Sequence, residues 1–161
     1  EPITLTLWLK PNLAPGATVT VSTTRDANQN NTLIDRRAKK GEIWRTWTSA
    51  NGQTQNQWVQ LTFPMPVVVK TVRLYNVRPG DEANATLLVT GATVKLYKDK
   101  SATNLVATAN TGALSPDGTD VAFNKVKARV VRIQINGATG TFYGMNVAGL
   151  AEIEVIARAA G

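Results

Sequence analysis

Hydrophobic and polar residues alternate along most of the chain with a period of two. Such alternation predicts half-buried β-strands, because successive side chains of a strand point to opposite faces of its sheet. Threonine and valine recur in these segments, which suits a pleated surface. The pattern predicts strands at residues 3–9, 18–21, 58–63, 67–75, 93–97, 120–123, 130–135 and 151–156.

Turn-forming residues separate the alternating segments. They occur at Pro15-Gly16, Asn51-Gly52, Pro64-Met65-Pro66, Pro79-Gly80-Asp81, Pro116-Asp117-Gly118 and Asn136-Gly137. No segment has the periodicity of an α-helix of three turns, and residues 157–161 are predicted to be a frayed end. Short strands spaced in this way indicate an all-β sandwich or barrel. We interpret residues 1–161 as a single domain.

Composition narrows the chemistry open to the chain. Its 161 residues suffice for one domain with its own core, and it contains neither cysteine nor histidine. Disulfides, Ser-His-Asp and Cys-His catalysis and the usual zinc sites are therefore excluded. No run of 18 apolar residues occurs, so no membrane-spanning helix is expected. We interpret the chain as a mature product or an excised module of a larger bacterial protein, secreted or at the cell surface.

The chain is basic, with 18 Lys and Arg against 11 Asp and Glu and a net charge of +7. Such a charge suits either an acidic partner or an ordinary solvated surface. The one basic cluster, at residues 36–40, is too short for a nucleic-acid-binding stripe. No strand carries an aromatic ladder for base stacking, so we predict no nucleic-acid partner.

Several phrases together resemble one family. They are NLAPGATVTVS (12–22), Asp35, Trp47-Thr48-Ser49, WVQLTF (58–63), VVKTVRLYNVR (68–78), ARVVRIQI (128–135) and GLAEIEVI (149–156). In this order they resemble discoidin domains, also called coagulation-factor type C domains, which include family 32 carbohydrate-binding modules and fucose-binding lectins. The resemblance covers residues 12–156. It implies a jelly-roll β-sandwich of about eight strands, ligand-binding loops at one end, and often a buried structural calcium ion.

The resemblance also implies a calcium site, since calcium prefers several oxygen ligands. The implied ligands are the side chains of Asp35, Thr46 and Glu152 and the backbone carbonyls of Leu33, Arg37 and Ala151. Glu152 and Glu154 are expected to point to opposite faces of their strand, with Glu152 towards this site. The alternative is that Glu152 pairs with an arginine of the basic loop, which is longer than the family's usual loop.

A sugar-binding site is implied at the loop end of the sandwich. Sugars favour an aromatic ring against their C–H face and Arg, Asn or Asp at their hydroxyls. Arg78 and Asn84 match the family's spacing, and Asp81 lies in the same loop. The last loop offers Phe142 and Tyr143, and Trp44 could be a second platform. Alternatively, Arg78 anchors its own loop by pairing with Asp81 or Glu82. The absence of histidine argues against galactose as the sugar.

These observations favour a non-catalytic carbohydrate-binding module, with glycans as partners, and the basic loop indicates an acidic polysaccharide. A glycosidase needs two carboxylates about 5–10 Å apart across a cleft. Asp81 and Glu82 are adjacent and Glu152 and Glu154 are expected to diverge, so we predict no enzymatic activity. Two alternatives remain. Trp44 among basic residues imitates a loop that binds anionic phospholipid, and the chain could also be an adhesion module that contacts protein.

Overall fold

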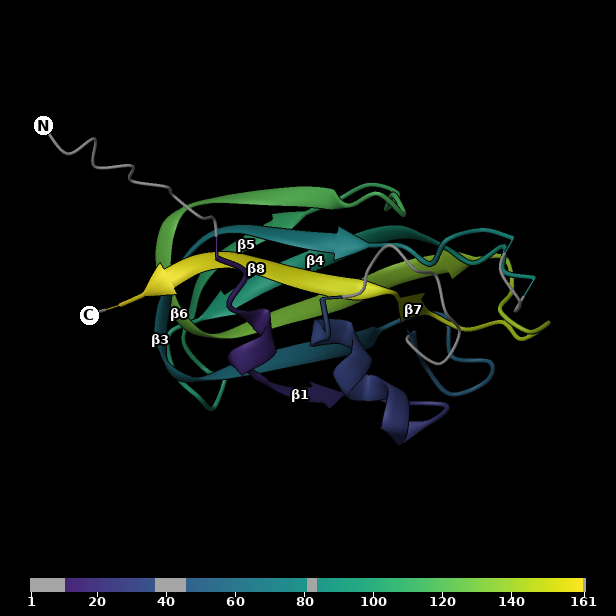
Figure 1. Cartoon of the computed structure of the whole chain (residues 1–161), viewed down its shortest axis with the longest axis horizontal. Helices are drawn as coiled ribbons and strands as arrows, with labels where there is room; N and C mark the ends of the chain where they lie inside the picture. The colour runs from purple at the N-terminus through teal and green to yellow at the C-terminus, as the bar shows by residue number, and fades with distance from the viewer. Residues whose placement is uncertain (1–10, 37–45, 81–83, 161) are drawn as a thin grey trace, which may run out of the picture.

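The computed structural model describes residues 11–36, 46–80 and 84–160. Two 3₁₀ segments, η1 (Ala14–Gly16) and η2 (Ala27–Ile34), precede or interrupt the strands (Figure 1). The strands are β1 (Thr18–Val21), β2 (Trp47–Thr48), β3 (Gln57–Tyr75), β4 (Leu88–Tyr97), β5 (Leu105–Asn110), β6 (Thr119–Thr139), β7 (Gly149–Leu150) and β8 (Glu152–Ala159). The predicted all-β class is confirmed. No described helix is long and apolar enough to cross a membrane.

The two long strands β3 and β6 organise the fold because each contributes to both layers. Residues 57–62 of β3 pair with β1 and with residues 130–135 of β6. Residues 67–75 of β3 pair instead with residues 119–128 of β6 and with β8. The register shifts between Thr62 and Val67, where Pro64 and Pro66 lack the N–H groups that a continuous ladder would need.

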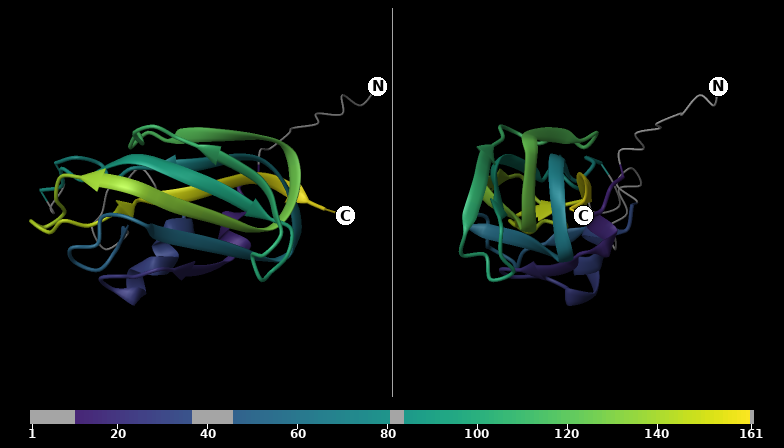
Figure 2. Two further views of the ribbon diagram at one scale, coloured as in Figure 1. Left: turned by 180° about the vertical axis from the view of Figure 1, so that it is seen from behind. Right: turned by 90° about the vertical axis from the view of Figure 1, so that its left-hand side faces the viewer.

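The strands form two layers, as a jelly-roll β-sandwich requires (Figures 1 and 2). One layer, which we call the five-strand layer, contains β1, the first half of β3, the second half of β6, β4 and β5. The other contains β8 with the remaining halves of β3 and β6. A short antiparallel pair, β2 with β7, lies at one end. The predicted architecture is confirmed.

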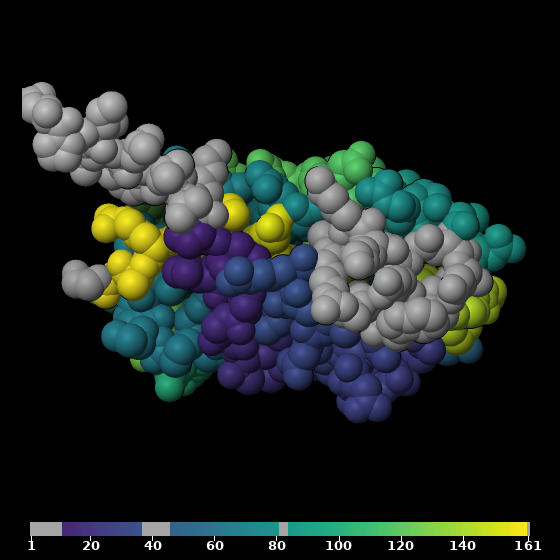
Figure 3. All heavy atoms as spheres, viewed as in Figure 1, coloured from purple at the N-terminus to yellow at the C-terminus, as the bar shows by residue number. Residues whose placement is uncertain are grey.

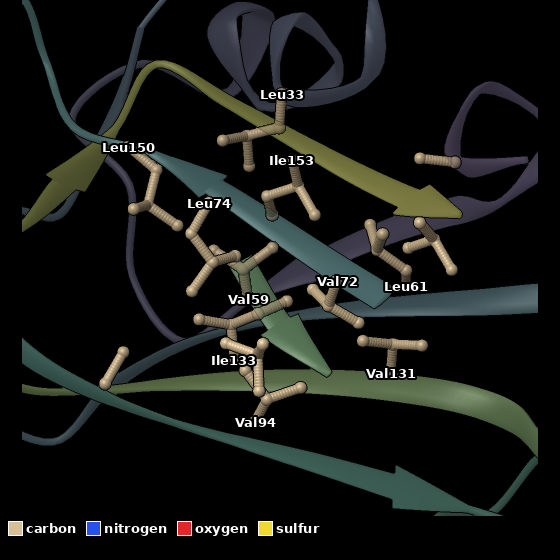
Figure 4. Packing of buried hydrophobic residues seen from close by; sticks show 14 of the residues in the cluster. Leu33, Val59, Leu61, Val72, Leu74, Val94, Val131, Ile133, Leu150 and Ile153 are labelled. Carbon is tan, nitrogen blue, oxygen red and sulfur yellow. The ribbon is translucent and has the colours of Figure 1, made fainter. Parts of the chain in front are cut away.

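The core lies between the layers and is built from alternate residues of each strand (Figure 4). Val59 and Leu61 of β3, Val131 and Ile133 of β6 and Ile153 of β8 are all fully buried. Burial of apolar area of this kind is the main stabilising contribution to such a fold. The same alternation turns the intervening side chains outwards.

Several predicted boundaries differ from the observed ones. The segments predicted at 58–63 and 67–75 form the single strand β3, and those at 120–123 and 130–135 lie within β6. The Asn136-Gly137 pair is not a turn, because Gly137 pairs with Gly91 at an irregularity inside β6. Residues 157–159 are not frayed, since they continue β8 along β3. The segment predicted at 3–9 lies outside the described residues.

The register places several loops at one end of the sandwich, which we call the loop end. Leu74 pairs with Thr119, Thr93 with Asn110, and Leu88 with Thr139. The segments that follow β3, β5 and β6 therefore leave the sheets at this end. At the opposite end Pro11 accepts a hydrogen bond from Ala157 N at 3.2 Å.

Candidate ligand-binding end and buried carboxylate site

A small apolar cluster joins two loops at the loop end. It contains Val77, Ala85 and Leu87 from the segment after β3, with Phe142 and Val147 from the segment after β6. Backbone hydrogen bonds reinforce it, because Thr86 N and Leu87 N both donate to Thr141 O, at 2.9 and 3.0 Å. The two loops therefore form one packed unit, separate from the main core.

The buried Asn76 side chain fixes the start of this unit. Its amide nitrogen donates to the carbonyls of Val77 and Leu87, at 2.9 and 2.8 Å, and its amide oxygen accepts from Val89 N at 2.9 Å. Buried polar groups are costly unless they are paired. A fully paired Asn76 therefore holds the loop in one geometry.

Three predicted ligand-binding residues lie beside this cluster in the sequence. Arg78 follows Val77, Asn84 precedes Ala85, and Tyr143 follows Phe142. The Arg78 side chain is 39% exposed, Asn84 is exposed, and Tyr143 is 43% exposed. The cluster thus brings these three side chains to the surface at one end of the sandwich. Trp44 and Asp81 lie outside the described residues.

Tyr143 stands at the tip of a tight turn. Phe142 N donates to Met145 O and Met145 N donates to Phe142 O, both at 3.0 Å. The two central residues, Tyr143 and Gly144, have φ values of 52° and 71°. Two positive φ angles define a type I′ turn, in which a non-glycine residue such as Tyr143 is uncommon. The turn projects the tyrosine ring into solvent.

Phe142 is fully buried, so the expectation that it contacts ligand is not supported by its position. Its ring packs edge-on against Tyr143, with the centroids 5.3 Å apart and the planes at 90°. The residue belongs to the apolar cluster because its neighbours Val77, Leu87 and Val147 enclose it. Phe142 supports the turn, and Tyr143 alone of the pair is accessible to a ligand.

Arg25 is a further candidate that the sequence did not indicate. It is exposed, and its guanidinium carbon lies 5.8 Å from the centroid of the Phe142 ring. Its Nε donates to Thr48 Oγ1 at 3.2 Å, which orients the side chain. Arg25 and Tyr143 therefore both contact the Phe142 ring. No local pattern marks Arg25, because its contact joins residues far apart in the sequence.

Arg78 pairs across two loops. Its Nη2 lies 2.9 Å from Asp117 Oδ1, in the loop that precedes β6. The expected alternative partners, Asp81 and Glu82, lie outside the described residues. The Asp117 side chain is 78% exposed, and an exposed ion pair of this kind contributes about 0–1 kcal/mol. A ligand hydroxyl could therefore replace or share this partner at little cost.

A buried carboxylate marks the start of β8. Glu152 is 0% exposed, and its Oε2 accepts a hydrogen bond of 2.7 Å from Arg36 N. Its other oxygen, Oε1, is buried and has no hydrogen-bond partner among the described residues. Among the described residues, Arg36 thus supplies its backbone N–H, and the other arginines of the basic loop lie outside them. Figure 3 shows residues of η1 and η2, purple to blue, beside the yellow residues of β8, with which both segments are in contact.

The pKa of Glu152 is raised to about 9, mainly by burial; the Arg36 N–H opposes this rise, and the neighbouring Asp35 carboxyl adds to it. A buried carboxylate beside a second carboxyl is unfavourable unless a proton or a cation neutralises it. The unpartnered Oε1 and the adjacent Asp35 therefore fit a hard cation.

The other predicted calcium ligands lie close by. Leu33 and Asp35 are at the end of η2, and Asp35 is its C-cap. Trp47 pairs with Leu150, so that Thr46 and Ala151 are the next residues in the antiparallel register. Thr46 is 1% exposed. Arg37 lies outside the described residues. Within the described part of the chain no three His, Cys, Asp or Glu residues gather, so a cation here would need hydroxyl and carbonyl oxygens as well.

The expectation that Glu152 and Glu154 diverge is wrong. Residues two apart in a strand share a face, and Ile153 between them is the one that points into the core. Glu154 accepts a hydrogen bond from the Tyr75 hydroxyl through Oε1, which also lies 3.6 Å from Arg73 Nη1. Burial, and then this bond to Glu154, raise the pKa of Tyr75 to about 12. Glu154 is thus engaged on the surface while η2 covers Glu152.

Known structures share this fold. A fucose-binding module from Streptococcus pneumoniae superposes with a TM-score of 0.68 and 21% identity, covering 91% of this chain and 94% of its own. The lectin domain of lectinolysin, solved with Lewis B antigen, gives 0.69 and 24%, covering 93% and 98%. A family 32 carbohydrate-binding module from C. perfringens NanJ, solved with galactose, gives 0.64 and 14%, covering 89% and 96%.

These likenesses confirm the galactose-binding-like β-sandwich fold that the sequence phrases indicated. No curated protein matches the sequence. Residues 12–156 match a family that is described as a domain of unknown function, DUF7402, and the chain belongs to that family.

Proposed function

We propose that the protein is a non-catalytic carbohydrate-binding module that binds glycans at its loop end. The observation that carries this proposal is Tyr143, an exposed aromatic ring at the tip of a tight turn at the loop end. The same end carries the exposed side chains of Arg78 and Asn84, and Arg25 contacts the neighbouring Phe142 ring. The fold supports it, because solved structures of the same fold include a fucose-binding module and modules in complex with Lewis B antigen and with galactose.

Each side chain has a distinct role in this proposal. The Tyr143 ring offers an apolar surface to the C–H face of a sugar, and Arg78 donates to its hydroxyls. Asn84 both donates and accepts, so it can bridge neighbouring hydroxyls. The surface is open and carries few contacts. We therefore expect weak binding per site, strengthened when several modules of a larger protein engage one glycan.

The same geometry supports a binding role in place of a catalytic one. Glu152 is buried beneath η2, and Glu154 is bonded to Tyr75, so the two carboxylates do not flank an accessible cleft. We propose that the module acts outside the cell or at its surface, as one domain of a larger protein.

We further propose that calcium is a structural ion held at the Glu152 site. Asp35, Thr46 and Glu152 would supply side-chain oxygens, with carbonyls from Leu33, Arg37 and Ala151. The support is the buried, unpartnered Oε1 of Glu152 next to Asp35. Such an ion would neutralise both carboxylates and tie η2 to the start of β8.

A glycan array tests the binding proposal. We expect the wild type to bind a defined set of glycans and Arg78→Ala to lose most of that signal. Met65→Ala serves as a control, because Met65 is 66% exposed in the bend of β3, away from the loop end. A flat wild-type array with pelleting on anionic liposomes would favour phospholipid binding. Flat results in both assays would favour a protein-adhesion module.

A further inference from the structure

The outward face of the five-strand layer carries a row of polar side chains in register. Thr20 pairs with Gln60, Gln60 with Arg132, Arg132 with Lys95, and Lys95 with Thr108. The residues that alternate with them, including Val59, Ile133 and Val94, are buried in the core. The row therefore faces away from the core, on the side seen in the left panel of Figure 2. We call this row, together with Trp58 and Tyr97, the sheet-face patch.

Arg132 stands at the centre of the patch and is held in a fixed orientation. Its guanidinium carbon lies 4.6 Å from the Trp58 ring centroid and 5.9 Å from that of Tyr97. Its Nε donates to Gln60 Oε1 at 2.8 Å. Stacking and this single bond remove most of the rotamer freedom of the side chain. The two terminal nitrogens have no hydrogen-bond partner among the described residues, and they form the fork that matches a carboxylate or a sulfate.

Among the residues that the structure describes, the patch has cationic charge without a counter-charge. The row through Arg132 contains no Asp or Glu, and neither does the adjacent row of Trp58, Gln134, Thr93 and Asn110. Neither Arg132 nor Lys95 forms an ion pair with a described residue, whereas Arg73 and Arg78 both do. An oriented, unpaired guanidinium in a surface free of carboxylates is complementary to an anion.

We propose that the sheet-face patch is a second binding site, for an anionic polysaccharide chain. Arg132 and Lys95 would bind the acidic group of a uronate or sulfated sugar, and Gln60, Thr20 and Thr108 would bind its hydroxyls. Strands lie about 4.8 Å apart, so a row across the layer spans about 19 Å, which accommodates several sugar units. The proposal does not depend on sugar binding at the loop end.

The chemistry favours a glycan over other polyanions. Single-stranded nucleic acid binds largely by stacking its bases on free aromatic faces, whereas the Trp58 ring already carries Arg132. A lipid surface is bound by apolar side chains that penetrate it, but the row itself consists of amide, hydroxyl and cationic side chains. A hydroxyl-rich anionic chain matches a row of amide, hydroxyl and cationic side chains and does not need a free aromatic face.

Affinity electrophoresis on one polymer backbone tests the proposal. The probes are dextran, which carries no anion, carboxymethyl-dextran, which carries carboxylates, and dextran sulfate, which carries sulfates. We expect binding to one or both anionic polymers and none to dextran. Arg132→Gln should weaken the binding at least about tenfold, because it removes a charge-assisted pair of hydrogen bonds. Lys95→Gln should weaken the binding several-fold. This second variant tests the proposal if Arg132→Gln folds poorly.

Matched controls separate a built site from general charge attraction. Lys70 is exposed in the second half of β3, in the other layer, so Lys70→Gln removes the same charge from a different face. It should leave affinity within about twofold, and so should Lys127→Gln, which removes an exposed charge from β6 in that other layer. Equal losses for Lys70→Gln and Arg132→Gln would overturn the proposal. So would equally tight, Arg132-dependent binding of single-stranded DNA or of anionic vesicles.

Discussion

The backbone N–H of Arg36 donates to the buried Oε2 of Glu152 at 2.7 Å, and this bond links the end of η2 to the first residue of β8. Arg36 adopts a left-handed backbone conformation there, with φ of 66°. A non-glycine residue in that region is strained, so the surrounding structure must hold it in place. The contact also holds the buried carboxylate at which we propose a structural ion.

Calcium should stabilise the protein through this site. A ligand at about 100 times its Kd adds about 2.7 kcal/mol to the free energy of unfolding. For a chain of this size that corresponds to a rise in Tm of about 5–10 °C. Differential scanning fluorimetry of chelator-treated protein, with and without added calcium, measures it. Glu152→Gln should abolish the rise and Glu154→Gln should preserve it. A Tm that does not respond to chelator or calcium would refute the site.

The stability of the metal-free protein should fall as pH rises. The pKa of Glu152 is raised in the folded state to about 9, from an unfolded value of 4.5. Its protonated form therefore stabilises the fold fully below about pH 4.5, and this contribution is lost as pH rises through about 9. Urea unfolding in chelator at pH 5, 7 and 9 should show a loss of a few kcal/mol. Glu152→Gln should remove most of this dependence of the unfolding free energy on pH. If the dependence persists in Glu152→Gln, other titratable groups cause it.

The two adjacent aromatic residues should separate stability from binding. Phe142→Ala should cost about 3–5 kcal/mol of unfolding free energy, because it empties the centre of the apolar cluster. Tyr143→Gly should instead leave stability unchanged or raise it by up to about 1 kcal/mol, since glycine suits its φ of 52°. Chemical denaturation measures both. Equal destabilisation by the two variants would contradict the assigned positions.

Gly140 should not tolerate a side chain. A Cβ there would lie 2.1 Å from Thr86 O, and its φ of 76° disfavours other residues. Gly140→Ala should therefore displace Thr141, to which Thr86 N and Leu87 N donate, and separate the two loops. We expect a loss of stability above about 2 kcal/mol together with loss of glycan binding. Gly16→Ala, where a Cβ meets nothing within 4 Å, is the matched control.

The alternating pattern predicted the core more reliably than the strand boundaries. Val59 and Leu61 face inwards as their spacing required. Pro64-Met65-Pro66 looked like a turn, but β3 only bends there, because it passes from one layer to the other. The sequence pattern did not predict strand β5. This strand lies at the edge of its sheet and buries few side chains, so its hydrophobic and polar residues do not alternate clearly.

The candidate sites followed from the sequence only in part. The family phrases indicated Glu152 and Asp35, which the structure brings together, and Arg78 and Asn84, which lie at the loop end. They could not show that Phe142 is buried, since that depends on the packing of Val77 and Leu87 from a distant loop. Arg25 and the stacking of Arg132 on Trp58 likewise arise from contacts between distant residues.

The most direct test of the account compares Tyr143→Gly with wild type on a glycan array at a temperature where both are folded. The substitution removes the exposed ring and suits the backbone, so a change in signal reports binding rather than unfolding. We predict that wild type binds a defined set of glycans and that Tyr143→Gly loses at least about tenfold of that affinity. Wild-type binding that Tyr143→Gly retains in full would contradict the claim that the loop end is the glycan site.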